Sequence, residues 1–177
     1  ALKDIDSMRT TVVTGGGSGI GRAIALRQAC AGDRVAIFER DEFAAEQVVV
    51  EILASGGAAI AVACDVADTA SVEHAFQRLD RVDALVNNAG IAHIGNVEQT
   101  SPDDLDRLYR VNVKGVYHCL HFAVPKMIQQ GGGVILNMAS IASKIGLLDR
   151  FAYSMTKGAV LTRTLSVARD YVDRHIR

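Results

Sequence analysis

The sequence has few cysteines, few prolines and almost no net charge, and each shortage excludes a class of protein. The three cysteines among 177 residues stand far apart and form no Cys-x-x-Cys pair, which argues against a disulfide framework. We expect buried thiols in a reducing cytoplasm instead. Two prolines and no low-complexity tract leave no candidate for a linker. With 19 basic and 20 acidic residues the net charge is −1, so no net basic field is available to hold nucleic acid.

Long hydrophobic runs are also missing. No apolar run reaches the roughly 18 residues that a membrane span needs, so we expect no membrane partner. The first eight residues contain acidic side chains and no long apolar stretch, which is not the pattern of a signal peptide. A chain of this length can bury roughly 70% of its unfolded surface. We therefore expect residues 1–177 to form a single domain in the cytoplasm.

What the sequence does contain is an alternation of short apolar runs and helix-like segments. The runs are apolar almost throughout, which is typical of strands covered on both faces. They span residues 11–13, 35–38, 60–63, 84–86 and 134–136. A helix is expected to begin at Ser101 and Pro102, and apolar stripes on this helix and on residues 161–172 are expected to face the core. The alternation predicts a doubly wound parallel sheet in a three-layer α/β/α arrangement.

A glycine-rich segment, TGGGSGIG at residues 14–21, directly follows the first apolar run and precedes a helix-like segment at residues 22–31. A helix N-terminus offers free N–H groups and partial positive charge to a pyrophosphate, and glycines allow its close approach. An acid, Glu39, stands 18 residues past Gly21, at the end of the second apolar run. A carboxylate there can accept hydrogen bonds from a ribose 2′-hydroxyl and would repel a 2′-phosphate. The segment predicts a dinucleotide site.

At this point the sequence resembles the short-chain dehydrogenase/reductase family, whose loop reads TGxxxGxG. The resemblance continues in chain order with Asp65-Val66, which looks like the family's adenine contact, and with the NNAG signature at residues 87–90. It implies a Rossmann-type fold and an active-site tetrad. The residues that match the tetrad are Asn112, Ser140, Tyr153 and Lys157. The predicted cofactor contacts are Gly15, Ser18, Gly19, Ile20, Gly21, Glu39, Arg40, Asp65, Val66, Asn88, Gly90, Tyr153 and Lys157.

The side chains of the four tetrad residues are suited to proton transfer and to holding a substrate oxygen. Tyr153 and Lys157 are four residues apart on an expected helix and so share one face. A tyrosine is a poor base at neutral pH, but a nearby ammonium favours the phenolate, so Lys157 is expected to make Tyr153 a usable proton acceptor or donor. Ser140 can hold and polarise a substrate oxygen. The resemblance implies that Asn112 holds a water that links Lys157 to solvent.

Three residues, Glu39, Arg40 and Arg150, bear on the choice of cofactor and substrate. Glu39 favours NAD, whereas Arg40 could grip a 2′-phosphate or stack on adenine, and we expect NAD rather than NADP. Arg150, three residues before Tyr153, could bind a substrate carboxylate, as in relatives that oxidise 3-hydroxybutyrate and 2-keto-3-deoxy sugar acids. The alternative is an exposed arginine or one paired with Asp149, and then a neutral sugar, polyol or ketone. Tyr153 and Ser140 would complete the substrate contacts.

Several other expectations follow. The resemblance implies a homodimer or homotetramer that packs through the helices carrying Asn112 and Tyr153. It also implies a further strand, a substrate lid and a last strand beyond Arg177, so we expect the sheet to lack its C-terminal strands.

We expect no metal site at His118, Cys119 and His121, because the two histidines are three residues apart with no acidic ligand close by. Two alternative hypotheses for the function are a non-catalytic dinucleotide-binding module and a structural subunit that only forms oligomers.

Overall fold

The centre of the computed structural model, which describes residues 8–177, is a five-stranded parallel sheet with the strand order β3-β2-β1-β4-β5. Every neighbouring pair of strands is parallel, and Val12 of β1 lies between Ala36 of β2 and Leu85 of β4. The strands are β1 (Thr10–Thr14), β2 (Arg34–Glu39), β3 (Ala58–Ala63), β4 (Ala84–Asn87) and β5 (Val134–Asn137). Each contains one of the predicted apolar runs, so the sequence prediction of the strands is confirmed.

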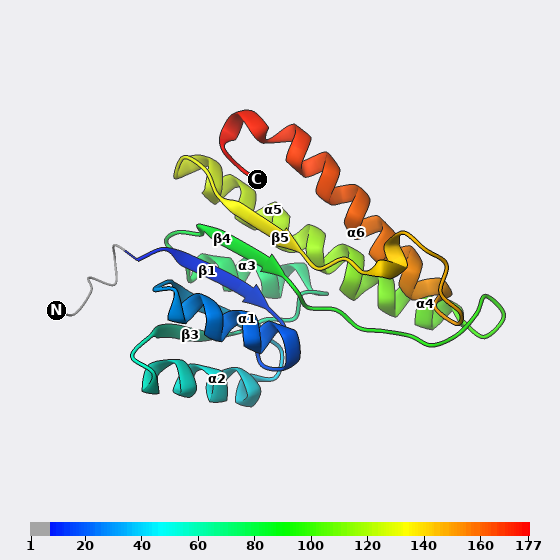
Figure 1. Ribbon diagram of the computed structural model, residues 1–177, viewed down its shortest axis with the longest axis horizontal. Coiled ribbons are helices and arrows are strands. Elements are labelled where there is room, and N and C mark those ends of the chain that lie inside the picture. The colour runs from blue at the N-terminus through cyan, green and yellow to red at the C-terminus, as the bar shows by residue number, and fades with distance from the viewer. Residues whose placement is uncertain (1–7) are drawn as a thin grey trace.

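Helices cover both faces of this sheet (Figure 1). One face carries α1 (Gly19–Cys30) and α2 (Glu42–Ala54), and the other carries α3 (Thr69–Gln77), α5 (Gly115–Gln129) and α6 (Phe151–Asp170). The alternation along the strands explains the two layers, because Val12 packs toward α3 and α5 whereas Val13 packs toward α1 and α2. The predicted Rossmann-type, three-layer α/β/α fold is confirmed.

The strand order reverses between β1 and β4. The chain goes outward from β1 to β2 and β3 on one side, and from β4 to β5 on the other. In open α/β sheets, ligands bind at the carboxyl ends of the strands where the order reverses. The glycine-rich loop after β1 and the NNAG segment after β4 both lie at this edge of the sheet.

The helix expected from Ser101 onward is interrupted by a short stretch of π-helix, which we call the π-turn. Ser101 caps α4 (Pro102–Leu108), because its Oγ accepts from the Asp104 N–H at 3.1 Å. A π-turn, η2 (Tyr109–Lys114), then joins α4 to α5 and contains Asn112. The prediction of one regular helix through Asn112 is therefore wrong. A π-turn inside a helix often marks a functional site.

Most of the second apolar stripe does not face the core. Leu165 on α6 is 66% exposed, and the buried residues of α6 lie in its first half, from Ala152 to Val160. The core prediction is therefore wrong for Leu165, Ala168 and Val172, which are exposed. Tyr171, at the end of the stripe, does pack against the core. After α6 the turn η4 (Val172–Arg174) leads to Ile176, which pairs in parallel with Gly133 next to β5.

Of the two expectations on membrane spans and signal peptides, only the first can be compared with the structure. Within residues 8–177 no helix combines the length and apolar character needed to cross a membrane. The signal-peptide prediction falls almost entirely on residues 1–7, which lie outside the described residues.

Candidate active site

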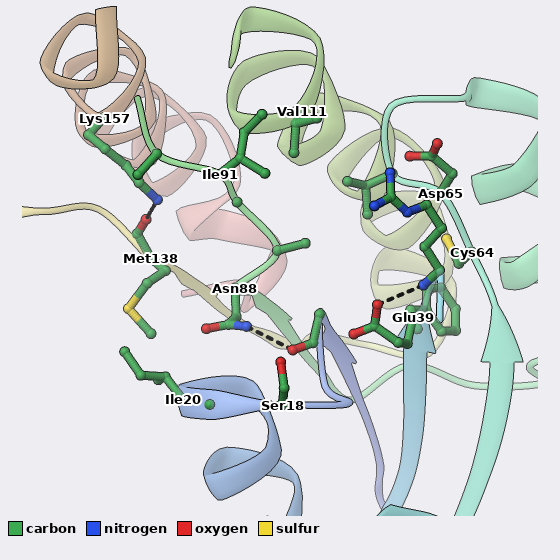
Figure 2. Close-up of a pocket in the computed structure, with 18 of the residues that line it drawn as sticks. Ser18, Ile20, Glu39, Cys64, Asp65, Asn88, Ile91, Val111, Met138 and Lys157 are labelled. Carbon is green, nitrogen blue, oxygen red and sulfur yellow. Dashed lines mark hydrogen bonds between the residues drawn. The ribbon is translucent and has the colours of Figure 1, made fainter. Parts of the chain in front are cut away.

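A cleft of about 570 Å³ lies at the carboxyl edge of the sheet, where the strand order reverses. This volume falls in the roughly 300–1,000 Å³ range of small-molecule sites. Figure 2 shows Glu39, Cys64 and Asp65 at one end of the cleft, and Met138 and Lys157 at the other. At the start of α1, Ser18 lines the cleft between these two ends and Ile20 lines it near Met138.

The glycine loop presents the N-terminus of α1 to the cleft. Ser18 is the N-cap residue, and its hydroxyl makes no capping hydrogen bond. Gly15 and Gly19 have φ angles of 63° and 53°, a conformation that favours glycine. A Cβ on Gly21 would stand 2.1 Å from the Gly15 carbonyl oxygen, so the loop and the helix meet too closely for any side chain there.

The loop is fastened to the segment that follows β4. The Asn88 side-chain amide donates to the carbonyl oxygens of Thr14 and Gly15 at 3.0 and 3.2 Å. The Thr14 hydroxyl accepts from the backbone N–H groups of Asn88 and Ala89, both at 3.0 Å. These contacts join the start of the glycine loop and Asn88 in one unit. Thr14 opens the predicted TGGGSGIG segment, but its role as the link to the segment after β4 was not predicted.

Glu39 occupies the end of β2 and braces two turns. One oxygen of its carboxylate accepts from the Gly17 N–H at 3.1 Å, and the other accepts from Arg40 and Asp41 at 2.9 and 3.3 Å. A Cβ on Gly17 would lie only 3.0 Å from Glu39 Cγ. The carboxylate is therefore held at the rim of the cleft in one orientation.

Cys64, Asp65 and Val66 form the wall beyond Glu39. Burial, with a smaller contribution from the Asp65 charge, raises the pKa of the Cys64 thiol to about 12, so the thiol stays protonated. Cys119 is buried as well, but Cys30 is exposed in the last turn of α1. The prediction of buried thiols is therefore wrong for Cys30. Asp65 is tied down by its own turn, where its Oδ1 accepts from the Ala67 N–H at 2.9 Å.

At the opposite end, the first turns of α6 present Tyr153 and Lys157 to the cleft. The Lys157 Nζ lies 5.9 Å from the centroid of the Tyr153 ring and donates to the Met138 carbonyl oxygen at 2.6 Å (Figure 2). The side chain is buried, and burial lowers the pKa of the Lys157 ammonium. A Cβ on Gly90 would lie 3.5 Å from the same Nζ, which places Gly90 beside the pair.

Asn112 is 1% exposed and holds two neighbouring segments together. Its Oδ1 accepts from the Ile91 N–H at 2.8 Å, and its Nδ2 donates to the Ile91 carbonyl oxygen at 2.9 Å and to Thr156 Oγ1 at 3.0 Å. Ile91 lines the cleft, and Thr156 precedes Lys157. A water at Asn112 would therefore need the second lone pair of Oδ1 or the backbone carbonyl.

Ser140 and Arg150 are not among the described residues that line the cleft, although Ser140 directly follows Ala139, which does. The Ser140 Oγ accepts from the Ala142 N–H at 3.2 Å, and this caps the short turn η3 (Ile141–Ser143). The Ser143 Oγ in turn accepts from the Ser140 N–H at 3.3 Å, which completes a capping box. The Arg150 Nη1 donates to the Asp149 carbonyl oxygen at 2.9 Å.

His118 uses both ring nitrogens within the protein. One nitrogen lies 2.8 Å from the Val66 carbonyl oxygen and the other 3.0 Å from Thr69 Oγ1. The ring therefore supports the segment next to Asp65.

The cleft fits a dinucleotide along its whole length. The start of α1 offers backbone N–H groups and a hydroxyl without a capping bond to phosphates. The absence of side chains at Gly15 and Gly21 lets the loop pack closely against the segment of Asn88 and Ala89. A fixed carboxylate at one end can receive ribose hydroxyls. The tyrosine and the ammonium at the other end can exchange a proton with a bound alcohol or carbonyl.

Comparisons with known proteins agree with this geometry. Residues 9–177 match the short chain dehydrogenase family. The chain is 43% identical over 171 residues to an uncharacterized oxidoreductase of Thermotoga maritima, covering 96% of this chain and 68% of that protein. It is 38% identical over 177 residues to 2-(R)-hydroxypropyl-CoM dehydrogenase of Xanthobacter autotrophicus, covering 96% of this chain and 71% of that protein.

Solved structures give the same result. A 7α-hydroxysteroid dehydrogenase complexed with NADH superposes with a TM-score of 0.91 at 32% identity, covering 96% of this chain and 68% of the other. A gluconate 5-dehydrogenase from Burkholderia cenocepacia in complex with NADP and tartrate has a TM-score of 0.91 at 34% identity, with the same coverage. Fold, cleft and sequence agree that the chain belongs to the short-chain dehydrogenase/reductase family, the NAD(P)-dependent oxidoreductases that act on CH–OH groups.

Proposed function

We propose that this chain transfers a hydride between NAD and a secondary alcohol or ketone, with Tyr153 as the proton donor and acceptor. The observation that carries the proposal is that one cleft joins the glycine loop and Glu39 at one end to Tyr153 and Lys157 at the other. A dinucleotide-binding module would need the glycine loop and Glu39 only, and a structural subunit would need neither pair, so the presence of Tyr153 and Lys157 in the same cleft favours an enzyme.

The proposed chemistry uses the charge of Lys157. The nicotinamide, when bound, supplies the hydride acceptor or donor. Lys157 is held by the Met138 carbonyl with its ammonium near the Tyr153 ring, and this charge stabilises the negative charge that develops on the Tyr153 oxygen when Tyr153 gives its proton to a carbonyl. In the reverse direction Tyr153 takes the proton from an alcohol. The Ser140 oxygen accepts from the Ala142 N–H, which leaves its hydroxyl proton to donate to the substrate oxygen. Asn112 keeps its proposed part in a water path to Lys157.

We propose NAD rather than NADP because of the carboxylate at the end of β2. Glu39 is fixed by three backbone N–H groups, so it cannot turn away from a cofactor without losing these bonds. A 2′-phosphate would meet this charge, whereas a ribose hydroxyl can donate to it. Arg40 follows it and is exposed, which suits stacking on the adenine.

Glu39→Ala is expected to raise the ratio of NADP to NAD utilisation, measured as kcat/KM, by at least about tenfold, because a like-charge contact is removed. Glu46→Ala, which removes an exposed acid of α2, is the matched control and should leave the ratio unchanged. An unchanged ratio in Glu39→Ala would contradict the ribose role.

For the substrate we propose a small hydroxy acid or sugar acid. Arg150 stands one turn before Tyr153, and its bond to the Asp149 carbonyl uses only one of its donors. The remaining fork can bind a carboxylate in a two-pronged way. The second candidate is a neutral sugar, polyol or ketone, and the place of Arg150 outside the cleft lining favours it.

Arg150→Met is expected to raise KM for the best hydroxy acid about tenfold or more and to leave KM for neutral alcohols within about twofold. Arg174→Met, which removes an exposed arginine after α6, serves as the control. Equal effects of both variants on the acids would favour the neutral substrates.

We also propose a homodimer or homotetramer that forms through the helices carrying Asn112 and Tyr153. Tyr117 on α5 and Leu165 on α6 are 53% and 66% exposed, and large apolar side chains on these faces suit a subunit contact. The cytoplasmic location and the single domain over residues 1–177 stay predictions.

A further inference from the structure

An arginine of α6 reaches the π-turn that contains Asn112. The Arg163 Nη1 donates to the Val113 carbonyl oxygen at 2.7 Å, across 50 residues of sequence. Val113 is buried, and Arg163 is half-buried, between α6 and η2. Arg163 belongs to none of the motifs that define the glycine loop or the tetrad.

The π-turn explains why a charged donor is useful there. A π-turn breaks the regular i to i−4 ladder of an α-helix, so backbone groups at its ends lose their usual partners. A buried carbonyl without a donor carries a desolvation cost, whereas a hydrogen bond from a charged group is among the stronger ones. The guanidinium of Arg163 supplies a charged donor to the Val113 carbonyl oxygen inside this segment, and the contact ties the π-turn to α6.

The residues next to this contact belong to the site. Val111, in the same turn, lines the cleft. Asn112 directly precedes Val113, and its side chain fixes Ile91 on the cleft wall and Thr156 beside Lys157. A shift of the turn would therefore move the cleft wall and loosen the support next to Lys157.

We propose that Arg163 is a positioning residue, which holds the π-turn so that Asn112 fixes Ile91 and Thr156 around the Tyr153–Lys157 pair. Its effect on turnover rests on the proposed function, whereas its effect on the Ile91 segment does not. Arg163 touches neither cofactor nor substrate in this account. It acts through Val113 and Asn112.

The test compares Arg163→Met with Arg163→Lys and with Arg169→Met, which removes an exposed arginine on the same helix. Arg163→Met is expected to lower kcat about tenfold to a hundredfold with KM for NAD within about twofold, because the reacting groups are displaced rather than the nucleotide. Arg163→Lys, which keeps a charged donor, should restore kcat to within about threefold of the native value.

Amide hydrogen exchange supplies a readout without turnover. The Ile91 N–H donates to Asn112, so a peptide over residues 88–95 should exchange about tenfold faster in Arg163→Met, with β1 unchanged. Equal exchange in Arg163→Met and Arg169→Met would overturn the proposal, and so would faster exchange over the whole chain. Faster exchange at 88–95 in a chain without any turnover would support the positioning role and contradict the proposed function instead.

Discussion

Tyr153→Phe is expected to lower kcat by about 10²–10⁴-fold, because the variant keeps the ring and loses the only group at this end of the cleft proposed to carry the proton. The dissociation constant for NAD should stay within about twofold, since the Lys157 bond to Met138 does not involve the phenol. Steady-state kinetics and a fluorescence titration with NADH measure the two quantities.

The control for this variant is Tyr117→Phe, which removes a hydroxyl from an exposed ring of α5. It should behave as the native chain in both measurements. A Tyr153→Phe chain with kcat within about threefold of the native value would contradict the assignment of the proton to Tyr153.

Gly21→Ala is expected to abolish measurable NAD binding and to lower the free energy of unfolding by about 2 kcal/mol or more. The new Cβ would stand 2.1 Å from the Gly15 carbonyl oxygen and 2.5 Å from Asn88 Nδ2. The nearer of these atoms is backbone and cannot rotate away, so the glycine loop must shift and lose its fit to a pyrophosphate. Chemical denaturation and calorimetric titration measure the two effects.

Gly158→Ala is the matched control, because Gly158 is also in a helix and a Cβ there meets no atom within 4 Å. It should raise the free energy of unfolding by roughly 0.5–1 kcal/mol, as alanine is the better helix former. Equal stability and NAD affinity in Gly21→Ala and the native chain would show that the loop is not the rigid cradle described here.

The fold could be predicted from the sequence because its strands carry a strong local signal. Each strand of the parallel sheet is a short, nearly unbroken apolar run such as Val35–Phe38, and these runs need no tertiary context to be recognised. The stripe on residues 161–172, most of which does not face the core, shows the limit of this reasoning. A helical period indicates an apolar face, but whether that face meets the core depends on how the helix lies on the sheet.

The candidate site likewise has one part that local sequence spacing predicts and another part that it does not. The glycine loop, Glu39 and the Tyr153–Lys157 pair follow from local spacing, and the structure brings them into one cleft. The π-turn around Asn112 does not follow from local spacing, because it depends on contacts between distant segments. Asn112 contacts Ile91, 21 residues away, and Val113 contacts Arg163, 50 residues away. The roles of Thr14 and Met138 were missed for a related reason, since each acts through a contact with a distant segment.

The measurement that tests the account most directly is hydride transfer from a secondary alcohol that carries deuterium on its carbinol carbon. The chain would be incubated with NAD and a panel of such hydroxy acids, sugar acids and neutral alcohols, and the nicotinamide ring analysed by mass spectrometry. The account predicts deuterium on the reduced ring with the native chain and its loss with Tyr153→Phe. Binding of NAD without any transfer of deuterium across the panel would contradict it and would favour a dinucleotide-binding module.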